Sequence, residues 1–246
     1  CKNVSSGASH INGTVLYPGE EFSAYETVSP FTEANGYAMA GSYLNGEVVD
    51  SMGGGICQVS TTLYNAVLRA ELNVTERSPH SMTVHYVDLS EDAAIAGTYK
   101  DFKFVNSTEY PIYIEGYTTS DKKITFNIYG KETRDKNRTI SFESQMVSET
   151  PATTILQEDA GQGIGYKAVS SKGSSGYVAE LYKIVKVNGV ETDRIKVNKS
   201  TYKGTNRVVT YGTAGDPTLS ENLRAAIAAQ DEALADANIA AAVPAQ

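Results

Sequence analysis

Cysteine is scarce in this sequence, since only Cys1 and Cys57 occur among 246 residues. Two thiols are too few for a disulfide-rich scaffold or for a four-ligand zinc site. A disulfide between the two cysteines is possible, but so low a cysteine count does not favour it. Cys57 is then either a small packing residue or a chemically active group.

Long apolar runs are also missing. No stretch approaches the ~18 consecutive apolar residues of a membrane span, and the sequence shows no signal peptide. We therefore expect no membrane contact within these residues. The first residues have the pattern of a helix that is already under way, so a leader or an upstream membrane anchor could precede them. Nothing in the sequence predicts an oligomeric state.

Tryptophan is absent and basic residues are in the minority. Lys and Arg number 21 against 29 Asp and Glu, which gives a net charge of −8, so nucleic acid is not expected as a partner. Only residues 138–213 are net basic, which indicates a separate unit. The 16 tyrosines and 21 glycines favour strands and turns over a helical bundle.

The apolar pattern divides the chain into four parts. Residues 1–130 combine a helix with several strands, and residues 131–138 form a charged break that is typical of a linker. Residues 139–213 are predicted to be all-β and rich in glycine turns. Residues 214–246 are dominated by alanine, and their thin apolar face predicts a tail.

Individual elements follow from local signals. Apolar residues at helical spacing predict a helix from Ile56 to Leu72, and alternation predicts a strand over Ser81–Val87. Asn45-Gly46 and Asn188-Gly189 each separate two apolar stretches, which predicts two-residue hairpin turns.

Three glycines, Gly53 to Gly55, precede the predicted helix and allow the backbone to turn sharply. Cys57 then lies in the first helical turn, where unpaired N–H groups and a partial positive charge favour a thiolate. The same N–H groups could hold an oxyanion during acyl transfer. Ser60 and Thr61 lie one turn further on the same side, where they could position a substrate amide.

A nucleophilic cysteine normally needs a base, and the sequence offers His10, His80 and His85. If a regular strand begins at His80, the side chains of His80 and His85 point to opposite faces, so at most one of them faces Cys57. Three carboxylates could orient the imidazole: Glu76, Asp88 and Asp92.

Each of these features also has a purely structural explanation. A lone cysteine near a helix start is more often a buried small residue than a nucleophile. A histidine at a strand edge is more often structural than catalytic, and the glycines could serve only a tight crossing of two chain segments. Residue spacing alone does not decide between these explanations.

The stretch from Gly53 to Ala66, Gly-Gly-Gly-Ile-Cys-Gln-Val-Ser-Thr-Thr-Leu-Tyr-Asn-Ala, resembles the central motif of the VanW domain family. The resemblance extends over residues 3–130 and implies an α+β catalytic domain, with one main helix against antiparallel strands. The supporting segments stand in the family's order: Asn12–Val15, Pro18–Ser23, Glu76-Arg77, His80-Ser81, Val84, Tyr86-Val87, Asp92-Ala93, Asp101–Phe104, Asn106, Pro111–Ile114 and Ile128–Gly130.

The second half resembles the G-five (G5) domain, a glycine-marked module of cell-surface proteins. The resemblance implies a mostly-β, elongated domain over residues 139–213. The similar segments are Gly173–Val178, Tyr182-Lys183, Asn188–Val190, Tyr202-Lys203 and Tyr211–Thr213.

Two positions depart from the VanW pattern. Ser78 stands where the family has a further histidine, which indicates that this extra histidine is dispensable. Ser90-Glu91 stands where the family usually shows Gly-Arg. If that arginine binds a substrate carboxylate in the family, this chain binds the carboxylate in another way.

The resemblance implies an extracytoplasmic L,D-transpeptidase of the bacterial cell wall, which forms three-three cross-links between peptidoglycan stem peptides through a cysteine thioester. It assigns Cys57 as the nucleophile, His80 as base and acid, and Asp92 as the group that orients His80. The expected substrate-binding or oxyanion residues are Gly54, Gly55, Gln58, Ser60, Thr61 and Ser81. Neither a metal nor an organic cofactor is needed. The expected partners are stem peptides and, for the G5 half, wall glycan.

Two other functions fit the same residues. A peptidoglycan-cleaving cysteine amidase or endopeptidase would use the same Cys and His but let water take the thioester. A non-catalytic wall-binding module would use Cys57 only for packing.

Overall fold

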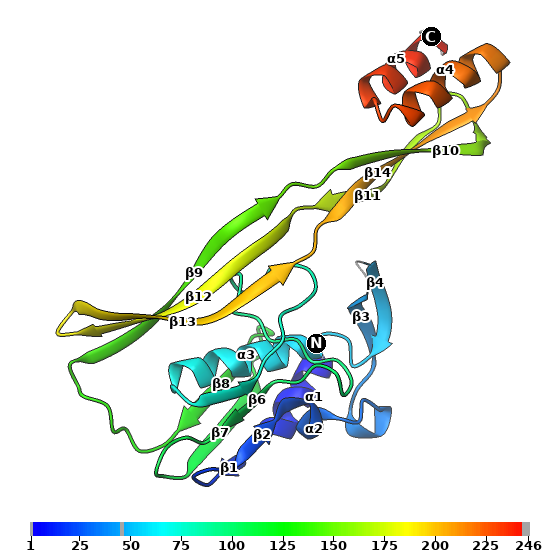
Figure 1. Ribbon diagram of the computed structural model, residues 1–246. Helices are drawn as coiled ribbons and strands as arrows, with labels where there is room; N and C mark the ends of the chain where they lie inside the picture. The colour runs from blue at the N-terminus through cyan, green and yellow to red at the C-terminus, as the bar shows by residue number, and fades with distance from the viewer. Residues whose placement is uncertain (1, 45–46, 243–246) are drawn as a thin grey trace. The chain divides into compact units, whose positions relative to one another are not determined.

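The computed structural model describes residues 2–44 and 47–242, and the chain forms two compact units (Figure 1). The first unit combines Cys1–Ser148 with Val178–Tyr202, and the second combines Glu149–Tyr177 with Lys203–Gln246. The chain is mostly β with a few helices. The units do not divide at the charged segment 131–138, because strands on both sides of this segment pack in the first unit.

The predicted central helix is present in the first unit. Its buried residues Ile56, Val59, Leu63 and Val67 recur at helical spacing and face the core. The helix ends earlier than predicted because Glu71, just beyond its last turn, has a left-handed φ of 57°. The helices of this unit are α1 (Lys2–Ile11), α2 (Ala24–Val28), the 3-10 helix η1 (Glu33–Asn35) and α3 (Ile56–Arg69).

Two small antiparallel sheets and a hairpin surround these helices. One sheet has the order β1 (Thr14–Leu16), β7 (Ile112–Thr118), β8 (Ile124–Tyr129), and the other has the order β2 (Glu21–Ser23), β6 (Lys103–Val105), β5 (Asn73–Glu76). The hairpin strands β3 (Met39–Leu44) and β4 (Glu47–Met52) pair antiparallel. The predicted turn Asn45-Gly46 lies outside the described residues.

A further sheet of the first unit comes from the second half of the sequence. Its order is β13 (Val190–Tyr202), β12 (Gly176–Val187), β9 (Arg138–Thr150). Leu181 of β12 is fully buried in the same apolar core as α3, and Phe142 and Val197 pack against that core. The predicted hairpin turn at Asn188-Gly189 is confirmed, since both residues have the positive φ that such a turn requires.

The predicted strand over Ser81–Val87 is wrong. Residues 77–95 contain no helix or strand, and His85 and Tyr86 are both exposed. The backbone N–H of His80 donates to the Asp92 carboxylate and that of Ala94 donates to the Ser78 carbonyl. These bonds fold the segment on itself, so it forms a loop instead of joining a sheet.

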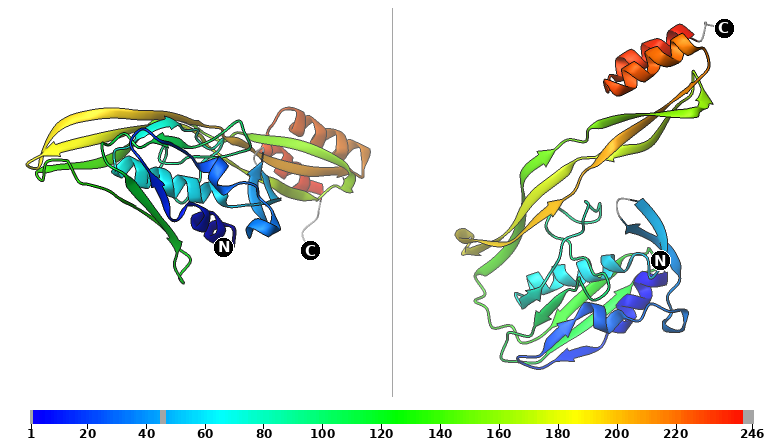
Figure 2. Two further views of the ribbon diagram at one scale, coloured as in Figure 1. Left: turned by 90° about the horizontal axis from the view of Figure 1, so that it is seen from below. Right: turned by 45° about the vertical axis from the view of Figure 1, so that its right-hand side comes forward.

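In the second unit, strands and helices pack together (Figure 2). Strand β14 (Thr205–Ala214) lies between β10 (Thr154–Gly163), which is parallel to it, and β11 (Lys167–Ser174), which is antiparallel. The segment predicted as an alanine-rich tail folds instead as α4 (Pro217–Ala228) and α5 (Glu232–Ala242). Small side chains allow close helix packing, and Ala226 and Ala235 are fully buried beside Leu223.

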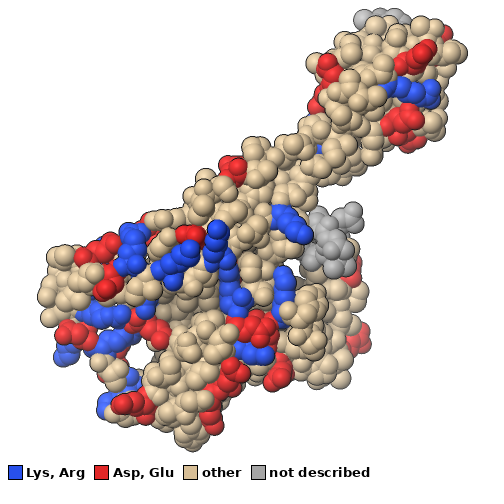
Figure 3. All heavy atoms as spheres, in the orientation of Figure 1, with Lys and Arg blue, Asp and Glu red and all other residues tan. Residues whose placement is uncertain are grey.

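Charged side chains of both signs are interspersed on the face shown in Figure 3. Ion pairs of the described residues include Arg207 with Glu232 and Lys196 with Glu180. Among the residues that the structure describes, no helix is long and apolar enough to cross a membrane.

Candidate active site

The glycine turn before α3 fixes the start of the helix. A side chain at Gly54 would collide with the carbonyl of Ala40, and Gly55 has a φ of 90° as the helix N-cap. The buried amide of Asn3 donates to the carbonyls of Gly54 and Ala38 at 2.9 Å each. The turn is therefore clamped to helix α1, and the position of Cys57 is set by rigid surroundings.

Cys57 is half-buried in the first turn of α3 and is a free thiol. Its Sγ donates to the carbonyl oxygen of Ile95 at 3.4 Å. The disulfide partner considered from the sequence, Cys1, lies outside the described residues.

Ser60 and Thr61 hold the neighbouring loop. The Ser60 hydroxyl donates to the Ala93 carbonyl at 2.6 Å, and the Thr61 hydroxyl accepts the Ala93 N–H at 3.0 Å. Both side chains are buried. Their hydroxyl groups therefore fix the loop against α3 and are already engaged, so they are poorly placed to hold a substrate amide.

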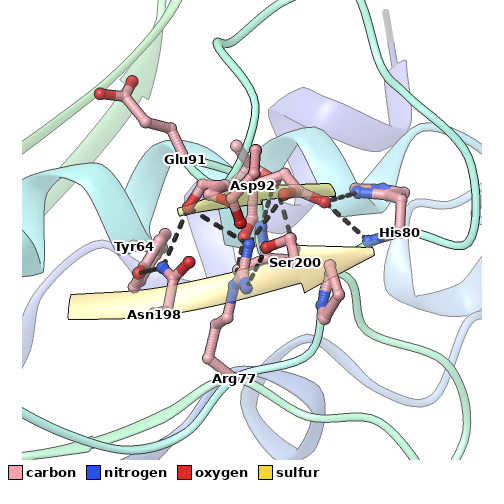
Figure 4. A network of polar contacts seen from close by, with 12 residues as sticks. Tyr64, Arg77, His80, Glu91, Asp92, Asn198 and Ser200 are labelled. Atoms are coloured by element: carbon pink, nitrogen blue, oxygen red, sulfur yellow. Dashed lines mark hydrogen bonds and ion pairs between the residues drawn. The ribbon is translucent and has the colours of Figure 1, made fainter. Parts of the chain in front are cut away.

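His80 and Asp92 form a tight pair in this loop, which Figure 4 shows from close by. The Nδ1 of His80 lies 2.7 Å from Oδ2 of Asp92, and the backbone N–H of His80 donates to the same oxygen at 2.6 Å. The side chain of Asp92 is 1% exposed and that of His80 is 13% exposed. The buried carboxylate thus sets both the backbone and the ring orientation of His80.

The other carboxylate oxygen of Asp92 has two donors. Arg77 donates to Oδ1 at 2.8 Å and the Tyr202 hydroxyl donates to it at 2.6 Å. Arg77 also donates to the Ser200 hydroxyl at 2.8 Å. Tyr202 and Ser200 both belong to strand β13, so the second half of the sequence completes the surroundings of Asp92.

These contacts change the proton affinity of the pair. Burial alone would lower the pKa of His80, but its hydrogen bonds to Asp92 and Cys57 and the charges of both groups raise this pKa to about 9. Burial of Asp92 opposes its charge, yet the hydrogen bonds from His80 and Tyr202 and the charge of Arg77 lower the pKa of this carboxyl. At neutral pH the imidazole is therefore protonated next to Cys57.

Comparison with known families fits this architecture. The model described as "VanW like protein" matches residues 1–129, and the model described as "G5 domain" matches residues 142–214. The chain belongs to the VanW-like family. A G5 domain follows its VanW-like region.

Two relatives of this VanW-like protein are curated proteins. "Uncharacterized protein YoaR" of Bacillus subtilis (strain 168) is 41% identical over 112 residues, which are 46% of this chain and 37% of YoaR. "Vancomycin B-type resistance protein VanW" of Enterococcus faecalis (strain ATCC 700802 / V583) is 29% identical over 134 residues, which are 52% of this chain and 48% of that protein. The chain thus spans less than half the length of either relative.

Solved structures are similar to the G5 part. "IgA1 Protease G5 domain structure" is 24% identical and covers 34% of this chain and 100% of its own, with a TM-score of 0.25. "Crystal structure of HP0197-G5" is 20% identical and covers 30% of this chain and 97% of its own, with a TM-score of 0.20.

The remaining histidines of the VanW-like region lie elsewhere. His10 is exposed on α1, where its ring stacks on Tyr37 and its Nδ1 contacts the Ser6 carbonyl. His85 is exposed in the loop. The two other carboxylates considered for orienting His80 are not beside it, because Glu76 pairs with Lys103 and Asp88 is exposed.

The other predicted substrate-binding residues have diverse surroundings. The N–H of Gln58 donates to the Gly55 carbonyl, so this first-turn amide is engaged within the turn. Gly54 is buried and Gly55 is exposed, and Ser81 is exposed next to His80 in the chain. Of these residues, Gly55 and Ser81 are the most accessible from solvent.

Three residues of the VanW-like site were not predicted as site residues: Arg77, Ser200 and Tyr202. Arg77 stands in the family-like pair Glu76-Arg77, which was a usable signal. No sequence signal pointed to Tyr202 or Ser200, because both come to the site from a distant part of the chain. No group of His, Cys, Asp and Glu that could hold a metal occurs in the described part of the chain.

A cavity of the first unit lies away from Cys57. It has a volume of about 850 Å³ and lies at the opposite end of α3. Some of its charged lining residues form ion pairs, in which Glu71 binds both Arg138 and Arg134. Cys57, by contrast, lies at the other end of the helix, in its first turn.

Proposed function

We propose that this protein is a peptidoglycan L,D-transpeptidase that forms three-three cross-links between stem peptides, with Cys57 as the nucleophile. The observation that carries the proposal is that His80 interacts on one side with the half-buried thiol of Cys57 and on the other with the buried carboxylate of Asp92. A nucleophile, an imidazole and a carboxylate that orients it are the parts that acyl transfer through a thioester requires.

The raised pKa of His80 supports a role for this residue as a proton donor. In the proposed reaction Cys57 attacks as the thiolate with its proton on His80, because an imidazolium beside a cysteine favours that form. His80 then serves first as an acid. This differs from the expectation that His80 takes the thiol proton during attack. The step that His80 assists is then departure of the leaving group, to which it donates a proton.

In the proposed reaction, the Cys57 sulfur attacks the carbonyl that follows the L-centre of diaminopimelate in a tetrapeptide stem. A carbon–sulfur bond forms, the bond to D-alanine breaks, and His80 gives its proton to the leaving amine. The side-chain amine of a second stem then attacks the thioester. The carbon–sulfur bond breaks, a new amide forms and the amine proton returns to His80.

Backbone N–H groups at the start of α3 would hold the oxyanion. Gln58 is engaged with Gly55, so we assign this role to the amide of Cys57 itself together with the partial positive charge of the helix start. Ser81, exposed beside His80, would contact the stem peptide. Ser60 and Thr61 would act indirectly, by fixing the loop that carries Asp92.

We propose an extracytoplasmic location at the cell wall and wall glycan as the partner of the G5 half. The name of the Enterococcus faecalis relative refers to vancomycin resistance, which supports a role at the cell envelope. The G5 match supports attachment to a wall component.

The test is incubation of the protein with disaccharide-tetrapeptide, followed by mass spectrometry of the products. We expect cross-linked dimers, release of D-alanine and a thioester adduct on Cys57, all lost in Cys57→Ala. Thr62→Ala is the matched control on α3, because its hydroxyl only bonds the Gln58 carbonyl. Cleaved monomers instead of dimers would indicate a hydrolase. Unchanged substrate with a well-folded protein would indicate a non-catalytic wall-binding module.

A further inference from the structure

Strand β13 presents three polar side chains to the loop that carries His80 and Asp92. Asn198, Ser200 and Tyr202 alternate along the strand, so they share one face. Asn198 donates to the hydroxyl of Tyr64 at 2.8 Å, and Figure 4 shows it and Ser200 on the strand beside Asp92. All three lie outside residues 1–129, which match the VanW-like family.

Tyr202 has the most specific contacts of the three. Its hydroxyl accepts the N–H of Ser90 at 2.7 Å and donates to Oδ1 of Asp92 at 2.6 Å. The side chain is buried, with 3% exposure. The Tyr202 hydroxyl therefore both donates and accepts a hydrogen bond within the loop. A side chain that served only for apolar packing would not require this hydroxyl.

We propose that Tyr202 is a positioning residue of the active site, which acts through Asp92 on the orientation and proton affinity of His80. Strand β13 is then part of the catalytic unit, although it belongs to the region that matches the G5 domain. This role adds to any attachment function of the G5 half. The expected effect of Tyr202 on turnover rests on the proposed function, whereas its effect on His80 does not.

The physical reason lies in how the charge of Asp92 is shared. Its carboxylate receives two hydrogen bonds from His80 at one oxygen and one each from Arg77 and Tyr202 at the other. Without the Tyr202 hydroxyl, more of this charge is available to the proton on His80, which would then be held more tightly. An imidazolium that holds its proton more tightly is a weaker acid toward the leaving amine.

Tyr202 keeps its proton over the working range of pH. Burial and the neighbouring charge of Asp92 raise the pKa of Tyr202 to about 12. The other titratable or charged groups around the pair are Cys57 and Tyr86 at His80, Arg77 at Asp92, and Lys100 at the Pro79 carbonyl.

The experiment compares Tyr202→Phe in the full chain with the wild type by NMR titration of the His80 ring. His80→Gln identifies the resonance among the three histidines. We expect the titration to move upward by about half a pH unit or more. We also expect kcat for cross-linking to fall about tenfold at unchanged KM, as for loss of a group that orients another.

Tyr182→Phe is the matched control. Tyr182 lies on β12 of the same sheet and also donates to a carboxylate, that of Glu180, at 2.7 Å. It should change neither the titration nor kcat. A folded Tyr202→Phe protein with a wild-type His80 titration would overturn the proposal.

A second replacement covers the case in which Tyr202→Phe does not fold. Replacing Tyr202 by 3-fluorotyrosine keeps the shape and makes the hydroxyl a stronger donor, so the His80 titration should move downward. An unchanged titration would again overturn the proposal. Because the titration does not require turnover, a shifted titration without cross-linking would refute the proposed function alone.

Discussion

A single oxygen of Asp92 binds both the ring and the backbone of His80, with Oδ2 lying 2.7 Å from Nδ1 and 2.6 Å from the backbone nitrogen. This two-point contact removes rotational freedom of the ring as well as freedom of the loop. It also directs the N–H at Nδ1 of His80 toward the carboxylate. The other ring nitrogen, Nε2, then faces the proposed reaction site.

The two-point contact predicts which histidine controls Cys57. In His80→Ala, alkylation of Cys57 by iodoacetamide should require a higher pH, because the imidazolium that favours the thiolate is lost. Turnover should fall about a hundredfold or more, the usual scale for loss of a general acid. His85→Ala and His10→Ala should leave both quantities unchanged. A pH shift in either of these variants, with none in His80→Ala, would contradict the assignment.

Stability should fall in the alkaline range because of His80. Its pKa is about 9 in the folded protein, above the ordinary value of 6.5. A raised pKa means that the stabilisation is complete below pH 6.5 and is lost as pH rises through about 9. The free energy of unfolding should therefore drop by roughly 1–3 kcal/mol between these values. Denaturant unfolding at several pH values measures this drop, and His80→Gln should remove most of it.

Glu71 should stabilise the end of α3. It pairs with Arg138, Arg134 and Lys183, and hydrogen bonding to Arg138, opposed by burial, lowers its pKa to about 2. This stabilisation is present above pH 4.5 and is lost as pH falls toward 2. Glu71→Gln should cost about 1–3 kcal/mol at neutral pH in urea unfolding, since it leaves charged donors without a charged acceptor.

Glu132→Gln is the matched control for Glu71. Glu132 also pairs with Arg134, but its side chain is 60% exposed, so its loss should not change stability measurably. If the two variants lowered the free energy of unfolding equally, burial of Glu71 would make no contribution to the strength of its ion pairs.

Limited proteolysis tests how the sequence halves pack. The segment between β8 and β9 is exposed and without regular structure, so a protease should cut there first. The fragments should remain associated in native buffer and separate only in denaturant, because β9, β12 and β13 pack on the core of the first unit. Separation of two folded fragments without denaturant, seen by size-exclusion chromatography, would contradict this packing.

Local signals in the sequence were sufficient to predict those elements whose conformation is determined by residues adjacent in the chain. The helix after Gly55 and the turn at Asn188-Gly189 were predicted because spacing and backbone preference determine them. The resemblance to the VanW family supplied the grouping of Cys57, His80 and Asp92, which no local signal contained. Whether these residues catalyse cross-linking stays a prediction.

Long-range contacts explain what was missed. Tyr202 reaches Asp92 across 110 positions of the chain, and periodicity carries no information on such a contact. Alternation over Ser81–Val87 predicted a strand, but side-chain bonds within the loop replaced the partner strand that a sheet requires. The alanines after residue 214 were predicted to form a tail, although their small size is what lets α4 and α5 approach each other.

The clamp between Asn3 and Gly54 has a mechanical consequence. Cys57 stands on a support that joins α1, the glycine turn and α3, and Gly54 leaves no room for the turn to shift toward Ala40. The histidine is carried by a loop whose residues Ala93 and Ile95 are buried in the core and whose Asp92 holds the imidazole through Oδ2. Packed backbone thus fixes the sulfur and a buried carboxylate fixes the imidazole, so an incoming stem peptide would meet a site that is already assembled.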